Sequence, residues 1–306
     1  MSYSCWRALF IWLPLLLVLL VLLLSSRPRK FIFIAIGSAP ENRYRRDACR
    51  RSWLSWRSSN VVYRFFTERN PAGREQTVLL NLESQTFRDI EFQPFPQGRQ
   101  VLQGARFLYQ ASWALNHYEF DFYLKTDDDV LVCVQKLERL LSERRKKLFW
   151  GKYWCKQDRS YPDESFMLFS ADVLRFLVQN RDFLLFDEEV SMAWNFGFLS
   201  RFLNITIFDD RNGIDSQQGY LTEFLHQPGF NRTKLSAADL CFCNRYLFAH
   251  HVHETVDLGI FKENLSLPSN YRMTIQSPVD TCGTKYSIIP CRKSRKLPQV
   301  QVRAIR

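Results

Sequence analysis

The sequence lacks both common glycine-rich phosphate loops. Neither G-x-x-x-x-G-K-[ST] nor G-x-G-x-x-G occurs among its 306 residues, so a nucleotide cannot be held by the backbone cradle that these motifs form. The chain also has no internal repeat and no long low-complexity linker. With 46% hydrophobic and 15% aromatic residues, its composition excludes a disordered chain, a collagen and a disulfide mini-protein. A large folded domain is therefore expected.

An excess of basic charge is missing from the body of the chain. The formal net charge is +11, but four bases without an acid fall in residues 1–30 and six without an acid fall in residues 291–306. Residues 31–290 keep 32 bases against 31 acids. A nucleic-acid-binding domain carries its basic footprint on the folded domain. We therefore expect no nucleic-acid partner, and the basic C-terminal tail 291–306 is left without an assigned role.

Charge is absent altogether from residues 8–24, which read ALFIWLPLLLVLLVLLL. As a helix this segment would span roughly 25 Å, near the lower limit for crossing a bilayer. A cleaved signal peptide is the alternative, but the sequence LSS that follows is a poor substitute for a small-residue A-x-A site. The segment predicts one transmembrane helix that is an uncleaved signal anchor, with a cytoplasmic tail over 1–7 and a very short stem over 25–30.

Two features give conflicting indications of the side of the membrane on which the body lies. The flank at 27–30 carries more positive charge than Arg7 and the amino terminus, which taken alone places the body in the cytosol. Against this, acceptor triplets for N-glycosylation begin at Asn204, Asn231 and Asn264. Seven of the eight cysteines follow the anchor, which suits disulfides in an oxidising compartment, and an odd number leaves at least one thiol free or paired between chains. We expect a lumenal body.

Apolar strand patterns alternate with helical patterns along residues 31–290. We expect strands at 31–36, 61–66 and 120–124, and helices at 42–56, 76–82, 100–115, 134–144 and 170–178. This alternation is typical of an α/β domain, in which ligands bind at the carboxyl ends of the strands. The length suffices for one large domain.

Three consecutive carboxylates, Asp127, Asp128 and Asp129, follow the predicted strand at 120–124. We call them the acidic triplet. Adjacent carboxylates repel one another, and a divalent cation such as Mg²⁺ or Mn²⁺, which prefers hard oxygen ligands, relieves that repulsion. A solvated acidic turn is the alternative. Because no glycine-rich loop is present, a metal ion at this strand end is the expected means of holding nucleotide phosphates and of neutralising a diphosphate leaving group.

Five blocks, in this order, resemble the β-1,3-glycosyltransferases of the galactosyltransferase family (glycosyltransferase family 31), which are type II membrane proteins of the Golgi. The similarity covers residues 31 to about 255. The first two blocks resemble the family's R-x-x-x-I-R-x-T-W and K-x-D-D-D-V motifs, the next two its S-x-D-L stretch and its E-D-V motif, and the last its closing block with a metal-binding His. In this sequence they are RRDACRRSW at 45–53, FYLKTDDDV at 122–130, SADVL at 170–174, EEVSM at 188–192 and CNRYLFAH at 243–250.

This resemblance implies a glycosyltransferase A-type α/β fold, Rossmann-like, with a mixed and mostly parallel central sheet. It implies Mn²⁺ or another divalent cation bound by Asp129 and His250. It further implies a UDP-sugar donor that contacts Arg50, Asp127 and Asp128.

The family inverts the anomeric centre, which requires a base to deprotonate the acceptor hydroxyl. Glu189 stands where the family has an Asp base, and its extra methylene displaces the carboxylate by roughly 1.5 Å. Where relatives have a glycine-rich stretch, this chain has YPDESFMLF at 161–169, so bulky Phe166 and Met167 have to be accommodated. Residues 150–154, WGKYW, could form an aromatic wall for an acceptor sugar, with core packing as the alternative.

The resemblance predicts an inverting β-1,3-glycosyltransferase that moves galactose, GalNAc or GlcNAc from a UDP-sugar to the 3-hydroxyl of an acceptor glycan on a glycoprotein, proteoglycan or glycolipid. It would be a single-pass type II Golgi enzyme with a lumenal catalytic domain over 31–290, alone or in a homo- or hetero-oligomer with other Golgi enzymes. The similarity leans towards the branch that builds proteoglycan linkage regions. A catalytically inactive relative acting as a glycan-binding or chaperone-like partner is the first alternative, and a cytosolic metal protein is the second.

Overall fold

The computed structural model describes residues 29–68, 74–96, 103–142, 146–156, 159–181, 206–209, 214–215 and 247–250. Several predicted features lie outside these residues, namely the tail 1–7, the anchor 8–24, Glu189, the glycosylation sites Asn204, Asn231 and Asn264, and the basic tail 291–306. Within the described residues, no helix is both long and apolar enough to cross a membrane. The first strand begins at Arg29, inside the predicted stem 25–30.

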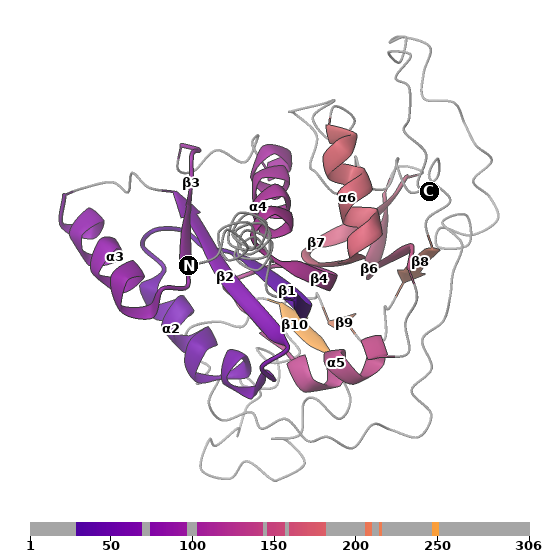
Figure 1. Ribbon diagram of the computed structural model, residues 1–306, viewed down its shortest axis with the longest axis horizontal. Helices are drawn as coiled ribbons and strands as arrows, with labels where there is room; N and C mark the ends of the chain where they lie inside the picture. The colour runs from indigo at the N-terminus through magenta and orange to yellow at the C-terminus, as the bar shows by residue number, and fades with distance from the viewer. Residues whose placement is uncertain are drawn as a thin grey trace, which may run out of the picture.

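A seven-stranded mixed sheet forms the centre of the domain (Figure 1). Its order is β3-β2-β1-β4-β7-β6-β8. The strands are β1 (Arg29–Gly37), β2 (Val61–Glu68), β3 (Ile90–Gln93), β4 (Glu119–Asp127), β6 (Leu148–Lys156), β7 (Arg159–Ser170) and β8 (Thr206–Asp209). The first four strands in the sheet order are mutually parallel, β7 is antiparallel to both of its neighbours, and β8 is parallel to β6. The predicted mixed, mostly parallel sheet is confirmed.

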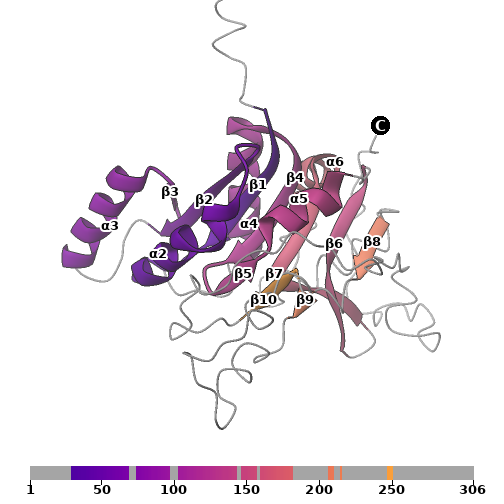
Figure 2. The ribbon, with the colours of Figure 1, turned by 90° about the horizontal axis from the view of Figure 1, so that it is seen from below.

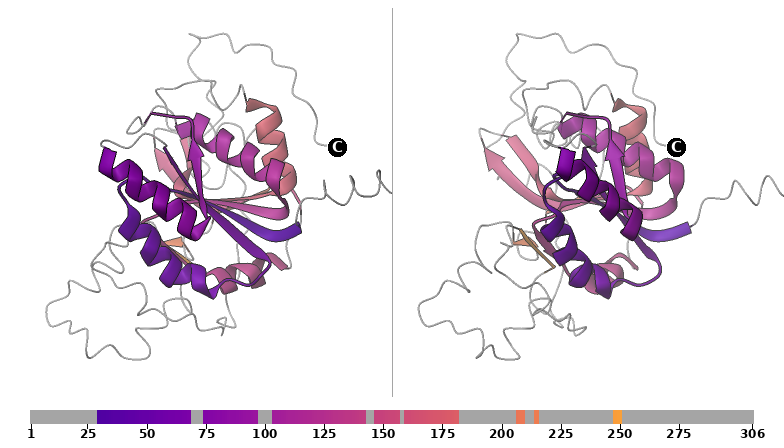
Figure 3. Two further views of the ribbon diagram at one scale, coloured as in Figure 1. Left: turned by 60° about the vertical axis from the view of Figure 1, so that its left-hand side comes forward. Right: turned by 90° about the vertical axis from the view of Figure 1, so that its left-hand side faces the viewer.

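Helices cover both faces of this sheet (Figure 3). They are α2 (Arg43–Arg51), the 3-10 helix η1 (Trp53–Trp56), α3 (Arg74–Phe87), α4 (Gln103–His117), α5 (Val134–Ser142) and α6 (Ala171–Gln179). One core cluster joins the sheet to α2, η1 and α5, and the other joins it to α4 and α6. The single helix predicted over 42–56 is therefore wrong in its second half, because it ends at Arg51 and a separate turn of 3-10 helix follows.

The position of β1 in the sheet explains why its sequence is continuously apolar instead of alternating between apolar and polar residues. Ile32, Ile34 and Ile36 belong to one core cluster, while Phe33 and Ala35 belong to the other. All five are fully buried, because successive side chains of a strand point to opposite faces and both faces are covered by helices.

A second, three-stranded sheet lies beyond the carboxyl ends of β1 and β4 (Figure 2). Its order is β5 (Val130–Val132), β10 (Phe248–His250) and β9 (Ile214–Asp215). Strand β10 runs antiparallel to β5, and His250 is the register partner of Val130. This small sheet therefore brings a distant part of the chain to the end of the acidic triplet.

The bulky segment at 161–169 lies in β7, a strand that the sequence analysis did not predict. Phe166 pairs in register with Thr126, and Met167 pairs with Lys125. Both side chains are fully buried. Trp150 is also fully buried, 6.0 Å from the Phe166 ring, so core packing rather than an acceptor wall is the outcome for this residue.

Candidate functional site

The acidic triplet forms the junction between β4 and β5. Asp127 ends β4 and Val130 begins β5, so the chain turns sharply at the carboxyl end of the parallel strands. The register places Gly37, the last residue of β1, beside Asp127. The triplet thus stands where a ligand is expected in an α/β sheet.

Asp128 ties the loop after β1 to the triplet. Its carboxylate is 5% exposed, and its Oδ2 accepts hydrogen bonds from Ser38 Oγ at 2.7 Å and Asn42 Nδ2 at 3.0 Å. Burial raises the pKa of Asp128 to about 6, although the two hydrogen bonds and the charge of Arg45 act in the opposite direction. The Asp128 carboxylate therefore positions residues 38–42 at the site.

Asp127 is held in place but stays open to solvent. Lys125 Nζ donates to Asp127 Oδ1 at 2.9 Å and to the Glu164 carbonyl oxygen at 2.6 Å. The Asp127 side chain keeps 37% of its surface exposed. A Cβ atom on Gly37 would lie 3.1 Å from Asp127 Oδ1, so the absence of a side chain at position 37 leaves room for this carboxylate.

Arg45 is the basic side chain of α2 that faces the triplet. Its Nη1 lies 3.4 Å from Asp128 Oδ1 and 3.7 Å from Asp129 Oδ2. The Arg45 and Asp129 side chains are 29% and 19% exposed. Burial alone would lower the pKa of Arg45, but the neighbouring carboxylates and Tyr44 raise it. Arg45 is therefore a fixed cation at the rim of the site.

Arg50, the predicted donor contact, lies in a different group of charges. It donates two hydrogen bonds to Asp89, at 2.7 and 2.9 Å, and further bonds to Glu83 and Asp47 at 2.8 and 2.7 Å. Its side chain is 8% exposed. The structure thus does not bring Arg50 against the triplet.

Arg46 connects this group to the site. It is fully buried and donates to both carboxylate oxygens of Glu83 at 2.9 and 2.7 Å. Its Nη1 also donates to Ser38 Oγ at 2.9 Å, and Ser38 in turn donates to Asp128. We call Arg46, Arg50, Glu83 and Asp89 the buried ion network.

The backbones of the two predicted metal ligands, Asp129 and His250, lie close together where β5 pairs with β10. His250 is the register partner of Val130, which directly follows Asp129. Within the described residues, no group of three or more His, Cys, Asp or Glu side chains is arranged to hold a metal ion. The partly open carboxylates of Asp127 and Asp129 are nevertheless hard oxygen ligands of the kind that Mn²⁺ or Mg²⁺ accepts.

Among the cysteines that the structure describes, Cys49 is a buried free thiol. Its Sγ donates to the Asp128 carbonyl oxygen at 3.4 Å. Burial raises the pKa of the Cys49 thiol far above its usual range, so this thiol packs against the turn of the triplet as a neutral, unreactive group.

The beta-1,3-galactosyltransferase 6 of Mus musculus is 26% identical to this chain over 202 residues. The chain resembles the β-1,3-galactosyltransferases. The aligned part covers 55% of this chain and 61% of that galactosyltransferase, so it spans less than two thirds of the relative's length. No family model matches the chain.

Solved structures with a similar arrangement are also glycosyltransferases. An active-site mutant of LgtC has a TM-score of 0.41 at 13% identity, and the aligned part covers 72% of this chain and 87% of the LgtC chain. The glycosyltransferase GlyE of Streptococcus pneumoniae has a TM-score of 0.38 at 12% identity and covers 59% and 45%. A glycosyltransferase involved in glycosylation of the PBCV-1 major capsid has a TM-score of 0.37 at 13% identity and covers 72% and 92%.

The galactosyltransferase-like blocks divide between the two ends of the sheet. Block 45–53 forms α2 and the start of η1, block 122–130 carries the triplet, and block 243–250 ends in β10, so all three meet at the carboxyl ends. Block 170–174 begins α6 at the opposite end, and block 188–192 lies outside the described residues.

Sequence reasoning missed the residues that support the triplet. Ser38, Asn42 and Arg45 supply its hydrogen bonds and nearest guanidinium. Their position in the sequence could have indicated this role. They lie in the loop after the first apolar strand and in the first turn of the following helix, and both segments adjoin the carboxyl ends of the strands.

Proposed function

We propose that this chain is a metal-dependent glycosyltransferase that moves a hexose, galactose first among the candidates, from a UDP-sugar to the 3-hydroxyl of an acceptor glycan. The observation that carries the proposal is the acidic triplet at the carboxyl end of β4, faced by Arg45 and flanked by the backbone of His250. The galactosyltransferase relative supports the sugar and the linkage.

A divalent cation, Mn²⁺ in this proposal, would be held by Asp129 and His250. When bound, it supplies positive charge to the diphosphate leaving group. Asp127 is fixed by Lys125 and remains partly exposed, which suits an acceptor of hydrogen bonds from the donor ribose. Asp128 holds the loop 38–42 in place rather than facing the donor, because its oxygens already accept bonds from that loop.

Arg45 takes the role that the sequence assigned to Arg50. Its partly exposed guanidinium is at the triplet, where it would meet the donor phosphates, and a planar guanidinium matches phosphate oxygens. Arg50 instead holds α2 in place through Asp89 and Glu83.

Glu189 is proposed as the base that removes the proton of the acceptor hydroxyl as this oxygen attacks the anomeric carbon from the face opposite UDP. The proton ends on the Glu189 carboxylate, and the bond between the sugar and UDP breaks. A carboxylate is a suitable base for this step when it is within hydrogen-bond reach of the hydroxyl.

The test is sugar transfer by the purified full chain from UDP-galactose, UDP-GlcNAc and UDP-GalNAc to a panel of acceptor glycans, with Mn²⁺ or with a chelator. We expect transfer that requires the metal and that is lost in Asp129→Ala and Glu189→Gln. Glu75→Ala, which removes an exposed carboxylate of α3, is the matched control and should keep full activity. Glycan binding without transfer from any donor would instead support the inactive, glycan-binding relative.

The cellular placement is part of the proposal and has a separate test. We propose a type II Golgi membrane protein with its catalytic domain in the lumen, attached through the apolar segment 8–24. Sensitivity of the expressed chain to an endoglycosidase, lost when Asn204, Asn231 and Asn264 are all changed to Gln, is the expected result. A full chain with no glycan at any of them would support the cytosolic alternative.

A further inference from the structure

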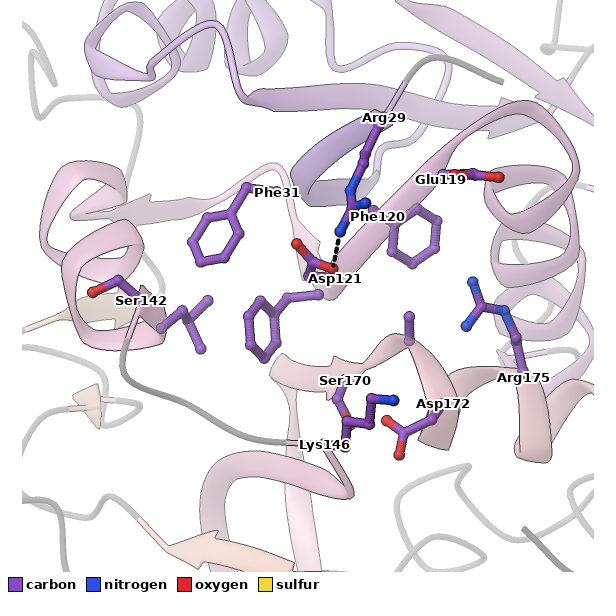
Figure 4. A pocket seen from close by; sticks show the side chains of 13 residues that line it. Arg29, Phe31, Glu119, Phe120, Asp121, Ser142, Lys146, Ser170, Asp172 and Arg175 are labelled. Carbon is purple, nitrogen blue, oxygen red and sulfur yellow. Dashed lines mark ion pairs between the residues drawn. The ribbon is translucent and has the colours of Figure 1, made fainter. Parts of the chain in front are cut away.

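A cavity of about 480 Å³ is lined by the first residues of β1 and β4 (Figure 4), whereas the acidic triplet lies at the other end of β4. The cavity lining also includes the end of α5 and the first turns of α6. None of these residues belongs to the candidate active site. The cavity is therefore separate from the proposed site of sugar transfer.

Part of the cavity lining is apolar, and most of that part is aromatic. Phe31, Phe120, Phe122 and Leu141 line it, and the Phe31 and Phe122 rings meet edge to face at 5.4 Å. Phe31 is only partly buried. Aromatic faces of this kind attract a quaternary ammonium group.

The rim of the cavity is charged, with both signs present. Arg29, Lys146 and Arg175 approach from three sides, from β1, the segment before β6 and α6 (Figure 4). Arg29 pairs with Asp121 at 3.6 Å, whereas Lys146 and Arg175 are exposed and form no ion pair with any part of the chain that the structure describes. These two cations are placed to receive an anion.

The beginning of α6 adds to this preference. Ser170 and Ala171 line the cavity at the start of this helix, where unpaired backbone N–H groups favour negative charge. The carboxylate of Asp172 already accepts the backbone N–H of Lys147 at 2.9 Å. With Glu119 and Asp121 on the other side, the lining holds three bases and three acids, which suits a zwitterion better than a purely anionic ligand.

The chain itself limits how far the cavity can lie from a membrane. Arg29 both begins β1 and lines the cavity. Four residues, 25–28, separate it from the apolar segment 8–24. Five backbone steps lead from Leu24 to Arg29. At about 3.4 Å per step, a fully extended linker reaches roughly 17 Å from the hydrocarbon core, which is within two or three widths of a headgroup layer.

We propose that the cavity receives the zwitterionic headgroup of a bilayer phospholipid and so seats the domain on the membrane with the acidic triplet facing away from it. Lys146 and Arg175 contact the phosphate, and Phe31 and the acids opposite contact the choline. The proposal rests on the membrane anchor of the proposed function, but not on the transfer reaction.

The experiment uses the full chain in phosphatidylcholine nanodiscs, with a benzophenone amino acid placed at Ser142, an exposed residue of the cavity lining. The control position is Glu41, which is exposed in the loop after the carboxyl end of β1. After illumination, mass spectrometry should find lipid adducts at position 142 and none above background at position 41. Equal adduct yields at the two positions would overturn the proposed orientation.

A second comparison tests the cavity itself. The double variant Lys146→Ala, Arg175→Ala should lower the adduct yield at position 142 by about tenfold, because charged hydrogen bonds to the phosphate are lost. Arg43→Ala, which removes an exposed cation at the other end of the sheet, should leave the yield unchanged. Equal yields in the double variant and the unchanged chain would overturn the proposal, as would a chain that does not enter nanodiscs.

Sugar transfer to a soluble acceptor, measured on the same samples, separates this proposal from the catalytic one. The double variant should keep its transfer rate, since both residues are remote from the triplet. A chain that shows the adduct preference but no transfer would contradict the proposed reaction alone.

Discussion

Two groups of charge meet α2, and they differ in how completely their carboxylates are enclosed. In the buried ion network, Glu83 and Asp89 are 0% and 7% exposed, and Arg46 and Arg50 reach them at 2.7–2.9 Å. At the acidic triplet, Asp127 and Asp129 are 37% and 19% exposed, and Arg45 stands 3.4–3.7 Å from the carboxylates nearest to it.

This difference separates the structural role of the buried ion network from the ligand-binding role that we propose for the acidic triplet. A buried ion pair with short, multiple hydrogen bonds is satisfied, so its removal damages the fold. Carboxylates that lie close together at a strand end repel one another, and a bound cation relieves this repulsion. Their partial exposure to solvent leaves oxygen atoms accessible to the cation. In this proposal, neighbouring arginines of α2 serve different purposes.

The largest effect is expected from Arg46→Met. It leaves Glu83 buried with one partner fewer and should lower the free energy of unfolding by about 3–5 kcal/mol. Arg43→Met, which breaks the exposed pair with Asp47, should lower it by less than about 1 kcal/mol. Urea unfolding of both variants is the measurement. Equal losses in the free energy of unfolding would show that the buried pair is no more important to the fold than the exposed pair.

Asp129→Ala should reduce activity strongly and stability little, the reverse of Arg46→Met. Transfer is expected to fall by about 10²–10³-fold, as for other electrostatic groups at reacting centres, while the free energy of unfolding stays the same or rises because repulsion within the triplet is relieved. Initial rates with saturating Mn²⁺ and a urea curve on the same sample measure both. A variant that unfolds easily would assign Asp129 to the fold instead.

Arg45→Met and Arg50→Met separate the two arginines of the first sequence block. We expect Arg45→Met to lower kcat/KM for the UDP-sugar by about tenfold through the loss of a charged hydrogen bond, with partial recovery in Arg45→Lys and little change in stability. Arg50→Met should chiefly reduce stability. Lost donor affinity in a stably folded Arg50→Met protein would restore the original assignment of Arg50.

Gly37→Ala probes the open side of the triplet with one methyl group. Because the new Cβ would lie 3.1 Å from Asp127 Oδ1, the carboxylate has to move, and we expect transfer to fall by about three- to tenfold, since small displacements at a reacting centre are costly. Gly104→Ala in the first turn of α4 is the control, expected to change stability by less than about 1 kcal/mol and to keep full activity. Identical rates for the two variants would show that Asp127 tolerates displacement.

The smallest effect concerns pH. Burial tends to raise the pKa of Glu83, but the hydrogen bonds and charges of Arg46 and Arg50 outweigh it and hold this pKa below its ordinary value of 4.5. A carboxyl whose pKa is lowered by folding contributes stability above pH 4.5, and that contribution is lost as the pH falls through the lowered value. In thermal melts from pH 6 to pH 3, Glu83→Gln should therefore show a shallower acid decline than the unchanged chain.

Strands β1, β2 and β4 and the helices between 29 and 142 could largely be predicted from sequence, because their apolar periodicity is strong. The short strands β3 and β5 were not predicted. Strands β6 and β7 could not be predicted, since their bulky segments around Trp150 and Phe166 are buried as antiparallel neighbours of a parallel sheet, and nothing local distinguishes that from an aromatic surface. The helix at 42–56 was predicted too long because its apolar spacing continues through η1.

Of the site, the triplet and its strand end were predicted, but its supporting contacts were not. Which of Arg45, Arg46 and Arg50 faces the carboxylates depends on where Glu83 and Asp89 lie, and these come from α3 and the turn before β3. Spacing in the sequence cannot reveal a partner that is brought in by tertiary packing.

Strand β1 also acts as a spacer. It runs from Arg29 at the cavity to Gly37 at the triplet, and nine residues of strand measure about 30 Å. For a domain whose cavity rests on a bilayer, the reacting sugar would stand at about that height above the lipid surface. A monosaccharide linked directly to a lipid could not reach it, whereas a glycan carried on a protein could, so the length of one strand would select among acceptors before any side chain contacts them.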